Sequence, residues 1–243
     1  MPTQTPWEEE ARNWAMWART PDHDVFSYYA PFFFDEIIPP SRGLTLEVGC
    51  GEGRVARQLA SRGFRVVAVD SSPTLVRFAR EADARSTYLV ADATELPFPA
   101  ATFHTVVAYN SLQTMAGIGD MADAVREAGR VLAPSGQFCF CVAHPMTDVG
   151  RIRERSAEGE LVIAGSYFEH RDVHETVMKD GLTMTFHGWT YSLEDYTRAL
   201  EDVGFTIDRV REPVPTAEQA ANRPGLERWR RIPLFLNVRA VKR

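Results

Sequence analysis

Residues 44–53 read LTLEVGCGEG, and this stretch decides the fold. The apolar run from Leu44 to Val48 predicts a buried strand, and glycines follow at positions 49, 51 and 53. A helical pattern begins at Arg54 and ends at Gly63. Because glycine has no Cβ and the first turn of a helix has unpaired N–H groups, the sequence predicts a ligand site at this turn.

The spacing of these glycines does not match the common nucleotide motifs. A dinucleotide fingerprint has its third glycine one position later, where this chain has Arg54. A phosphate loop needs Gly-Lys-Ser/Thr, which the segment lacks. Glu47 lies in the strand just before the turn, where its carboxylate disfavours a pyrophosphate and suits a ligand that carries an ammonium group.

Polar residues also end the next three apolar runs. Residues 64–70 end in Asp70, residues 87–92 in Asp92, and residues 103–110 in Asn110. In an open α/β sheet the ligand lies beyond the carboxyl ends of the strands, and a carboxylate about 20 residues after the glycines can accept both ribose hydroxyls. The four ends therefore predict one ligand site at one edge of a parallel sheet.

This series of motifs, Glu47-x-Gly-x-Gly-x-Gly53, Asp70, Asp92-Ala93 and Asn110, resembles the class I S-adenosylmethionine (SAM)-dependent methyltransferases. The resemblance is good over about residues 40–145 and holds only in outline elsewhere. It implies a Rossmann-like, doubly wound α/β fold. The expected sheet is seven-stranded and mostly parallel, with helices on both faces and an antiparallel last strand beside the fifth.

The same resemblance implies roles for the site residues, with SAM as cofactor and S-adenosylhomocysteine as its product. Glu47 is expected near the amino group of SAM and the glycine turn beside its methionine part. Asp70 is expected to hold the ribose, Asp92 the adenine amino group, and the Ala93 N–H the adenine ring. The full expected cofactor set is Glu47, Gly49, Cys50, Gly51, Gly53, Asp70, Ser71, Asp92, Ala93 and Asn110.

The flanking segments predict a cover for this site. Helical spacing over residues 7–19 and 25–38 predicts an N-terminal helical cap within residues 1–40, and the SAM-binding part is expected over residues 41–243. An insertion at 145–191 follows the fifth strand, and the family often covers its active site with such additions. The remaining expected elements are a hairpin of 173–179 with 182–187, a helix from Ser192 to Gly204, and last strands at 205–214 and 232–241.

Three residues are candidates for a general base. His144 lies at the expected tip of strand five, and His187 precedes an expected turn at Gly188-Trp189. An imidazole titrates near working pH, so either could take a proton from an acceptor OH or NH. Tyr28 is the third candidate. An acidic acceptor or an aromatic carbon would need no strong base.

Composition limits the partners. The net charge of −6 argues against a broad nucleic-acid surface, and Asn110-Ser-Leu-Gln113 differs from the Asn/Asp-Pro-Pro-aromatic motif of enzymes that methylate base amines. There is no 18-residue apolar run and no secretory pattern, so we expect a cytoplasmic protein without a membrane partner. The cysteines, Cys50, Cys139 and Cys141, predict buried free thiols, and no metal site is expected.

The sequence therefore predicts a SAM-dependent methyltransferase, monomeric or homodimeric, of the kind used in secondary metabolism. Its acceptor is expected to be a small aromatic or amphipathic molecule, methylated at O, N or C in a closed pocket. Two alternatives remain open at this point. One is an NAD(P)-dependent oxidoreductase on a similar sheet, and the other is a SAM-binding partner protein without catalysis.

Overall fold

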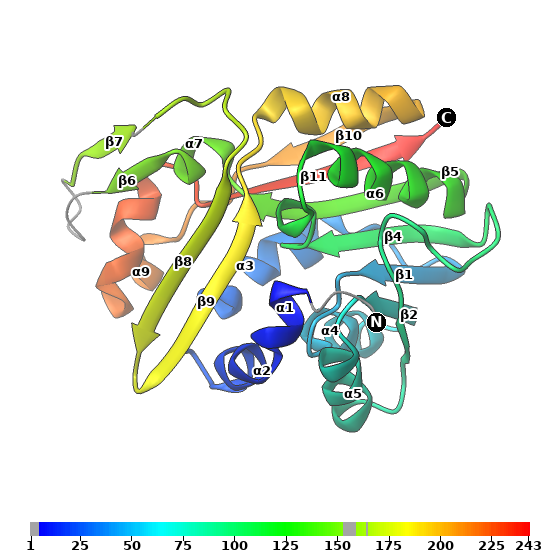
Figure 1. The fold of residues 1–243 in the computed structure, drawn as a ribbon, viewed down its shortest axis with the longest axis horizontal. Coiled ribbons are helices and arrows are strands. Elements are labelled where there is room, and N and C mark those ends of the chain that lie inside the picture. The colour runs from blue at the N-terminus through cyan, green and yellow to red at the C-terminus, as the bar shows by residue number, and fades with distance from the viewer. Residues whose placement is uncertain (1–4, 153–158, 164) are drawn as a thin grey trace.

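The computed structural model describes residues 5–152, 159–163 and 165–243. Its centre is a seven-stranded sheet in the order β10–β11–β5–β4–β1–β2–β3 (Figure 1). Neighbouring strands are parallel except that β11 is antiparallel to both β5 and β10. The strands are β1 (Leu44–Val48), β2 (Arg65–Asp70), β3 (Thr87–Val90), β4 (Phe103–Tyr109), β5 (Leu132–Ala143), β10 (Phe205–Arg211) and β11 (Phe235–Lys242). The predicted doubly wound fold is confirmed.

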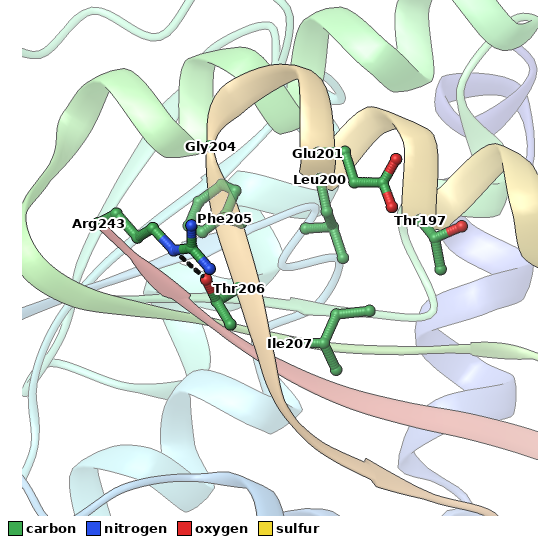
Figure 2. Close-up of a pocket in the computed structure, with 8 residues that line it drawn as sticks. All are labelled: Thr197, Leu200, Glu201, Gly204, Phe205, Thr206, Ile207 and Arg243. Carbon is green, nitrogen blue, oxygen red and sulfur yellow. Dashed lines mark hydrogen bonds between the residues drawn. The ribbon is translucent and has the colours of Figure 1, made fainter.

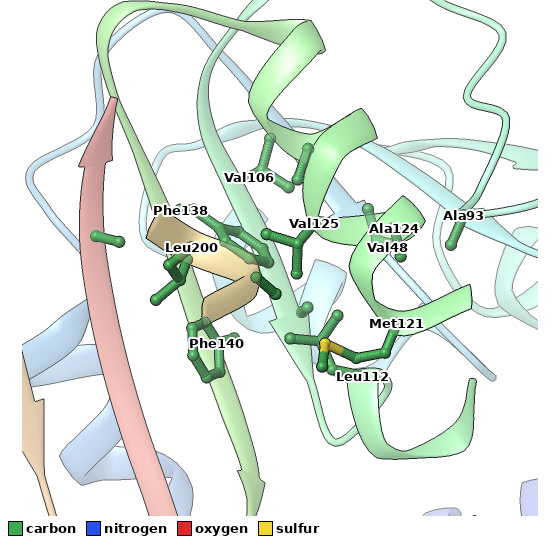
Figure 3. Close-up of a cluster of buried hydrophobic side chains, with 14 of the residues drawn as sticks. Val48, Ala93, Val106, Leu112, Met121, Ala124, Val125, Phe138, Phe140 and Leu200 are labelled. Carbon is green, nitrogen blue, oxygen red and sulfur yellow. The ribbon is translucent and has the colours of Figure 1, made fainter. Parts of the chain in front are cut away.

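Helices cover both faces of this sheet. One face packs against α6 (Ile118–Val131) and α8 (Leu193–Val203). The other packs against α3 (Phe26–Phe32), the π-helical turn η1 (Phe33–Ile37), α4 (Arg54–Ser61), α5 (Pro73–Ala82), α9 (Ala217–Asn222) and the 3₁₀ turn η3 (Pro224–Arg230). Successive residues of a strand point to opposite faces. Figure 3 shows Phe138 and Phe140 in the first cluster, whereas Cys139 and Cys141 join the second as buried thiols, as predicted.

Local sequence explains several helix ends. The Ser72 Oγ accepts the Leu75 N–H at 3.1 Å, and Pro73 occupies the first helical position of α5, where its missing N–H costs nothing. Ser192 and Asp195 form a capping box at the start of α8, which ends, as predicted, at Gly204 with a left-handed φ of 81°.

The cover lies beyond the carboxyl ends of the central strands (Figure 1). It consists of α1 (Pro6–Glu9), α2 (Ala11–Arg19) and a hairpin of β8 (Asp172–Lys179) with β9 (Leu182–Trp189), which pair antiparallel as predicted. The same edge carries the 3₁₀ turn η2 (Leu112–Thr114), the short helix α7 (Pro145–Asp148), and the small strands β6 (Gly150–Ile152) and β7 (Leu161–Ile163). We call α1 and α2 together the cap.

The expected N-terminal helix was wrong in detail, because the helix predicted over residues 7–19 is broken at Glu10 into α1 and α2. Two further features lie outside the predicted elements. Residues 134–136, Pro-Ser-Gly, lie inside β5, which begins at Leu132; there the register with β4 shifts, and Ser135 takes a left-handed φ of 59°. The polar connection at 213–231 contains α9 and η3.

Within the three described ranges, no helix combines the length and the apolar character that crossing a bilayer requires.

Candidate functional site

The backbone conformation and the close neighbours of the turn at the end of β1 explain why it is rich in glycine. Gly49, Gly51 and Gly53 all have left-handed backbones, with φ of 72°, 56° and 87°. A Cβ on Gly49 would lie 2.4 Å from the Cβ of Ser111, which also donates from its Oγ to the Val48 carbonyl at 2.7 Å. The turn therefore closes tightly against the tip of β4.

The carboxylate of Asp70 joins this turn to the next strand. Its Oδ2 accepts the Gly51 N–H at 2.7 Å, and its Oδ1 accepts the Ser72 N–H at 2.9 Å. Burial raises the pKa of the Asp70 carboxyl despite these two hydrogen bonds. Ser71, the neighbouring predicted residue, is exposed.

Glu47 supplies a buried acid with one unpartnered oxygen. Its side chain is 1% exposed, and its Oε2 has no hydrogen-bond partner in the described part of the chain. Burial, followed by repulsion from Asp70 and Glu52, raises the pKa of Glu47 well above its usual value. Cys50, in the turn, is also buried, and burial likewise raises the pKa of its thiol, which makes it a poor nucleophile.

The remaining predicted cofactor residues follow the neighbouring strands. Asp92 is exposed, and its Oδ1 accepts both the N–H and the hydroxyl of Thr94 at 2.8 Å. Ala93 is buried beside it. Asn110, at the tip of β4, has a left-handed φ of 54°, and its N–H donates to the Cys141 carbonyl at 2.8 Å. The structure thus brings the predicted set to one edge of the sheet.

These residues fit the cofactor that the sequence resemblance implies. The unpartnered carboxylate oxygen of Glu47 matches a ligand ammonium group, because a buried charge needs a counter-charge. The glycine turn permits close approach of a ligand to the backbone. Asp70 keeps acceptor capacity on both oxygens after its backbone bonds, since a carboxylate has about four lone-pair sites.

The cap is anchored directly on this edge. Glu8 of α1 accepts hydrogen bonds from Ser72 Oγ, from Thr74 N at 3.2 Å and from Thr74 Oγ1 at 2.7 Å. Burial by itself would raise the pKa of Glu8, but these hydrogen bonds and the nearby Arg77 together lower it. The acid also lies at the N-terminus of α5, where a negative charge is favourable.

The second helix of the cap contacts the glycine turn itself. A Cβ on Gly51 would lie 2.9 Å from the indole Nε1 of Trp14. Arg19 donates from Nε to Glu52 at 2.8 Å, and Arg57 donates to the same buried carboxylate at 2.8 Å and 2.9 Å. Closure of the cap and the conformation of the turn are therefore coupled.

Arg54 adds a further anchor at the start of α4. Its guanidinium lies 4.8 Å from the Trp14 ring centroid and 4.2 Å from that of Phe26, and it pairs with Asp24. Cation–π contacts of this kind contribute about 0.5–2 kcal/mol each. The residue that departs from the dinucleotide motif therefore holds the cap.

The hairpin completes the cover. The Phe186 ring packs edge to face on Trp14 and Trp17, with centroids 6.3 Å and 5.7 Å apart. Gly188 lies so close to η2 that a Cβ there would be 3.0 Å from the Gln113 carbonyl oxygen. Cap, hairpin and the tip of β4 therefore meet at one place.

His144 lies at the end of β5, as predicted, but both of its ring nitrogens are occupied. Nδ1 accepts the Met146 N–H at 3.1 Å, so in the neutral ring Nε2 carries the proton that is shared with Glu212 at 2.9 Å. Burial lowers the pKa of His144, although Glu212 opposes the shift. This arrangement is that of a helix cap, and it leaves no free nitrogen to act as a base.

His187 does not precede a turn as expected, because β9 continues through Trp189. Alternation directs His187 to the face opposite Phe186, the face on which Met178 is 80% exposed. Its Nδ1 lies 2.9 Å from Nδ1 of the cross-strand His174. This outward position disfavours a role in the pocket.

Tyr28, the third candidate base, lies on α3 and packs against the second hydrophobic cluster. The Arg223 guanidinium covers its ring at 5.2 Å from the centroid. The structure therefore does not bring Tyr28, His144 and His187 together, and their catalytic roles stay predictions.

Sequence reasoning missed the residues that join the cap to the site, above all Glu8, Arg19, Glu52 and Gln113. The position of Glu52 between two glycines of a tight turn was a usable signal in the sequence. Glu52 is 1% exposed in the structure, and a buried acid needs a cation. The partners Arg19 and Arg57 lie 33 and 5 residues away, and no local pattern selects Arg19.

A hollow of about 390 Å³ lies away from this edge (Figure 2). It is formed where α8 turns into β10 beside the C-terminal residue, and Arg243 donates to Thr206 Oγ1 there at 2.5 Å. In α/β sheets ligands bind at the carboxyl ends of the strands, so this hollow at the start of β10 is not the expected site.

We expect Arg19→Met to loosen the cap while the sheet stays folded, because Arg57 still pairs with Glu52. Arg19 is 40% exposed, so the loss should be modest, about 1 kcal/mol or roughly fivefold faster amide exchange over residues 6–19. Hydrogen exchange measures this. Arg12→Met, an exposed change on the same helix, is the control. Equal exchange in the two variants would show that the Arg19–Glu52 pair does not hold the cap.

Comparisons with known proteins also point to a methyltransferase. A family model described as "Methyltransferase domain" matches residues 46–140. A malonyl-[acyl-carrier protein] O-methyltransferase of Salmonella typhimurium is 37% identical over 95 residues, which are 39% of this chain and 37% of that protein. The putative methyltransferase YqeM of Bacillus subtilis is 24% identical over 201 residues, covering 75% of this chain and 81% of that one. The similarity to the Salmonella protein thus spans little more than a third of its length.

A solved structure extends the similarity to most of the chain. The S-adenosylmethionine-dependent methyltransferase from Mesorhizobium loti superposes with a TM-score of 0.69 at 25% identity, covering 88% of this chain and 98% of that one. The family match over residues 46–140 includes the glycine turn, Glu47 and Asp70. By its fold, its motifs and these relatives, the chain belongs to the class I S-adenosylmethionine-dependent methyltransferases.

Proposed function

We propose that the protein transfers a methyl group from SAM to a small aromatic or amphipathic molecule. The observation that carries this proposal is the buried Glu47 oxygen without a partner, beside a glycine turn and the Asp70 carboxylate. That set suits the ammonium and ribose groups of SAM and has no positive group for a pyrophosphate. The aromatic cover supports an apolar acceptor of small size.

The chain's part in this chemistry is binding, orientation and exclusion of water. SAM supplies an electrophilic methyl group on a sulfonium, and its transfer is an in-line displacement. Glu47 and Asp70 hold the charged and hydroxylated ends, and the cap and hairpin close over them. Holding two reactants at near-attack distance can supply about 7–11 kcal/mol of the barrier, so a strong base is not required.

The proposal also covers the acceptor class, the methylated atom and the oligomeric state. The net charge of −6 favours a small molecule over nucleic acid as acceptor. The methylated atom is O, N or C, and the protein acts as a monomer or homodimer.

Thermal unfolding tests the cofactor. S-adenosylhomocysteine at 100 times its Kd should stabilise the protein by about 2.7 kcal/mol, which raises Tm by about 5–10 °C for a chain of this size. NADH should have no effect, and Asp70→Ala should lower the ligand affinity at least tenfold, through lost hydrogen bonds. A shift with NADH alone would support the oxidoreductase alternative. A mass-spectrometric methylation screen of metabolites then separates an enzyme from a SAM-binding partner protein.

The raised pKa of Glu47 predicts proton release on binding. In the free protein the raised pKa favours the protonated acid. A ligand ammonium group favours the carboxylate, so binding expels a proton and tightens as pH rises from the ordinary Glu pKa of 4.5 toward the raised pKa of the free protein. Calorimetry with S-adenosylhomocysteine at pH 6 should be more exothermic in a buffer of high ionisation enthalpy. Glu47→Gln should lose part of this buffer dependence; an unchanged dependence removes Glu47 from the linkage.

The occupied nitrogens of His144 and the outward position of His187 predict a mechanism without an imidazole base. With an acceptor from the screen, His144→Ala and His187→Ala should each keep kcat within about tenfold, whereas loss of a true general base costs about 10²- to 10⁴-fold. Steady-state kinetics measures the difference. A drop of a hundredfold or more in either variant, with unchanged affinity for S-adenosylhomocysteine, contradicts the orientation mechanism.

A further inference from the structure

Two imidazoles face each other across the hairpin of the cover. His174 on β8 is directly opposite His187 on β9, and the two Nδ1 atoms lie 2.9 Å apart. The ring centroids are 4.9 Å apart, so the Nδ1 atoms lie on the facing edges of the rings. We call these two residues the histidine pair. They are 13 residues apart in the sequence, and only the register of the hairpin brings them together.

A carboxylate supports the histidine pair from the side of β8. Asp172 lies two residues before His174 on the same face of the strand, and its Oδ2 is 2.6 Å from Nε2 of His174. Nε2 therefore carries the proton, which leaves Nδ1 of His174 with a lone pair that faces His187. A carboxylate that holds the second nitrogen of an imidazole in this way is the common partner of a metal-bound histidine.

The histidine pair is open to ions from solvent. The side chains of His174 and Asp172 are 54% and 51% exposed. The next pair along this face, Thr176 and Thr185, is neutral, with its hydroxyl oxygens 3.1 Å apart. The carboxylate of Asp172 is thus the charge beside the pair, and it attracts cations.

The separation of the two nitrogens indicates which ions fit. A bond from a metal to an imidazole nitrogen is about 2.0–2.1 Å long, so nitrogens 2.9 Å apart subtend about 90° at a shared ion. Right angles are typical of the square-planar and tetragonal sites that Cu²⁺ and Ni²⁺ prefer. A tetrahedral Zn²⁺ would require the nitrogens to move to about 3.4 Å apart.

The number of protein ligands also limits the kind of site. Within residues 5–152, 159–163 and 165–243, no group of three His, Cys, Asp or Glu side chains is arranged to hold a metal ion. The histidine pair therefore offers two ligands, and water completes the coordination. An ion held in this way exchanges with solvent, unlike the ion of a closed structural site with four protein ligands.

We propose that His174 and His187 form a binding site for Cu²⁺ or Ni²⁺, with Asp172 as a positioning residue behind His174. The ion takes the place of the proton that the two Nδ1 atoms share. Because its ligands come from two strands, the ion links β8 to β9. The Trp7 ring of the cap lies 6.4 Å from the His187 ring, so this link adjoins the contact between hairpin and cap.

Titration calorimetry of the metal-free protein with CuCl₂, with glycine present as a weak competitor, measures the site. We expect one tightly bound Cu²⁺ per chain, held at least tenfold more tightly than Zn²⁺, because copper forms the stronger complexes and zinc prefers tetrahedral angles. Electron paramagnetic resonance should show two imidazole nitrogens bound to the copper. Equal affinities for Cu²⁺ and Zn²⁺ would contradict the right-angle geometry.

Three variants locate the ligands. His174→Gln and His187→Gln should each weaken Cu²⁺ binding at least tenfold and remove one nitrogen from the spectrum. Asp172→Asn should weaken binding while both nitrogens remain, since loss of a supporting carboxylate costs about 10- to 100-fold in metal affinity. His104→Gln, at an exposed position on β4, is the control and should leave the affinity unchanged.

Hydrogen exchange tests the link between the strands. With Ni²⁺ bound, the amides of residues 172–189 should exchange more slowly in the original protein, but not in His187→Gln. Unchanged exchange in the original protein would show that the ion does not link the strands. Equal Cu²⁺ affinity in the original protein and in both histidine variants would show adventitious binding elsewhere and overturn the site. Unchanged affinity in Asp172→Asn would remove Asp172 from it.

Discussion

The double hydrogen bond of the Asp70 carboxylate is the interaction on which the site depends. By accepting the N–H groups of Gly51 and Ser72, it fixes the glycine turn relative to the start of α5. The cap then builds on both partners, since Glu8 bonds to Ser72 and Trp14 packs on Gly51. Removing the carboxylate would affect the turn, the helix start and the seat of the cap together.

This arrangement places several acids close together, and its stability depends on how each is balanced. Glu52 is buried but meets two arginines, and Glu8 meets the hydroxyl and N–H groups at a helix start. Glu47 alone has an oxygen that no described group satisfies. The contrast identifies Glu47 as the acid that a ligand completes, because a buried charge without a partner is costly.

The sequence predicted those parts of the fold that depend on local residue patterns. Apolar runs bounded by turns located the central strands, and the order of their polar ends predicted which edge carries the site. The bulge in β5 was missed because its Pro-Ser-Gly looks like an ordinary turn. The helix α9 was missed because its six residues are too short for a helical period to show.

The site was predictable only as far as the backbone determines it. Glu47, Asp70 and Asn110 lie where strands end, and the sheet brings those ends together. The surroundings of the two histidines depend on more than the backbone. Which face His187 occupies depends on where β9 ends, and whether His144 is free depends on Glu212, 68 residues away. Likewise, Trp14 and Gly51 are far apart in the sequence, and no periodic pattern predicts that they are in contact.

The linker between α2 and α3 has a consequence for how the chain folds. Arg223, on the C-terminal side, donates to the carbonyls of Asp22, His23 and Asp24, and Lys179 at the hairpin tip also donates to His23. The helices α1 and α2 therefore obtain these supports only after about 200 further residues have been made. Until then their tryptophans are exposed, and such apolar surface favours aggregation. The contacts that secure this linker thus come from residues made long after it.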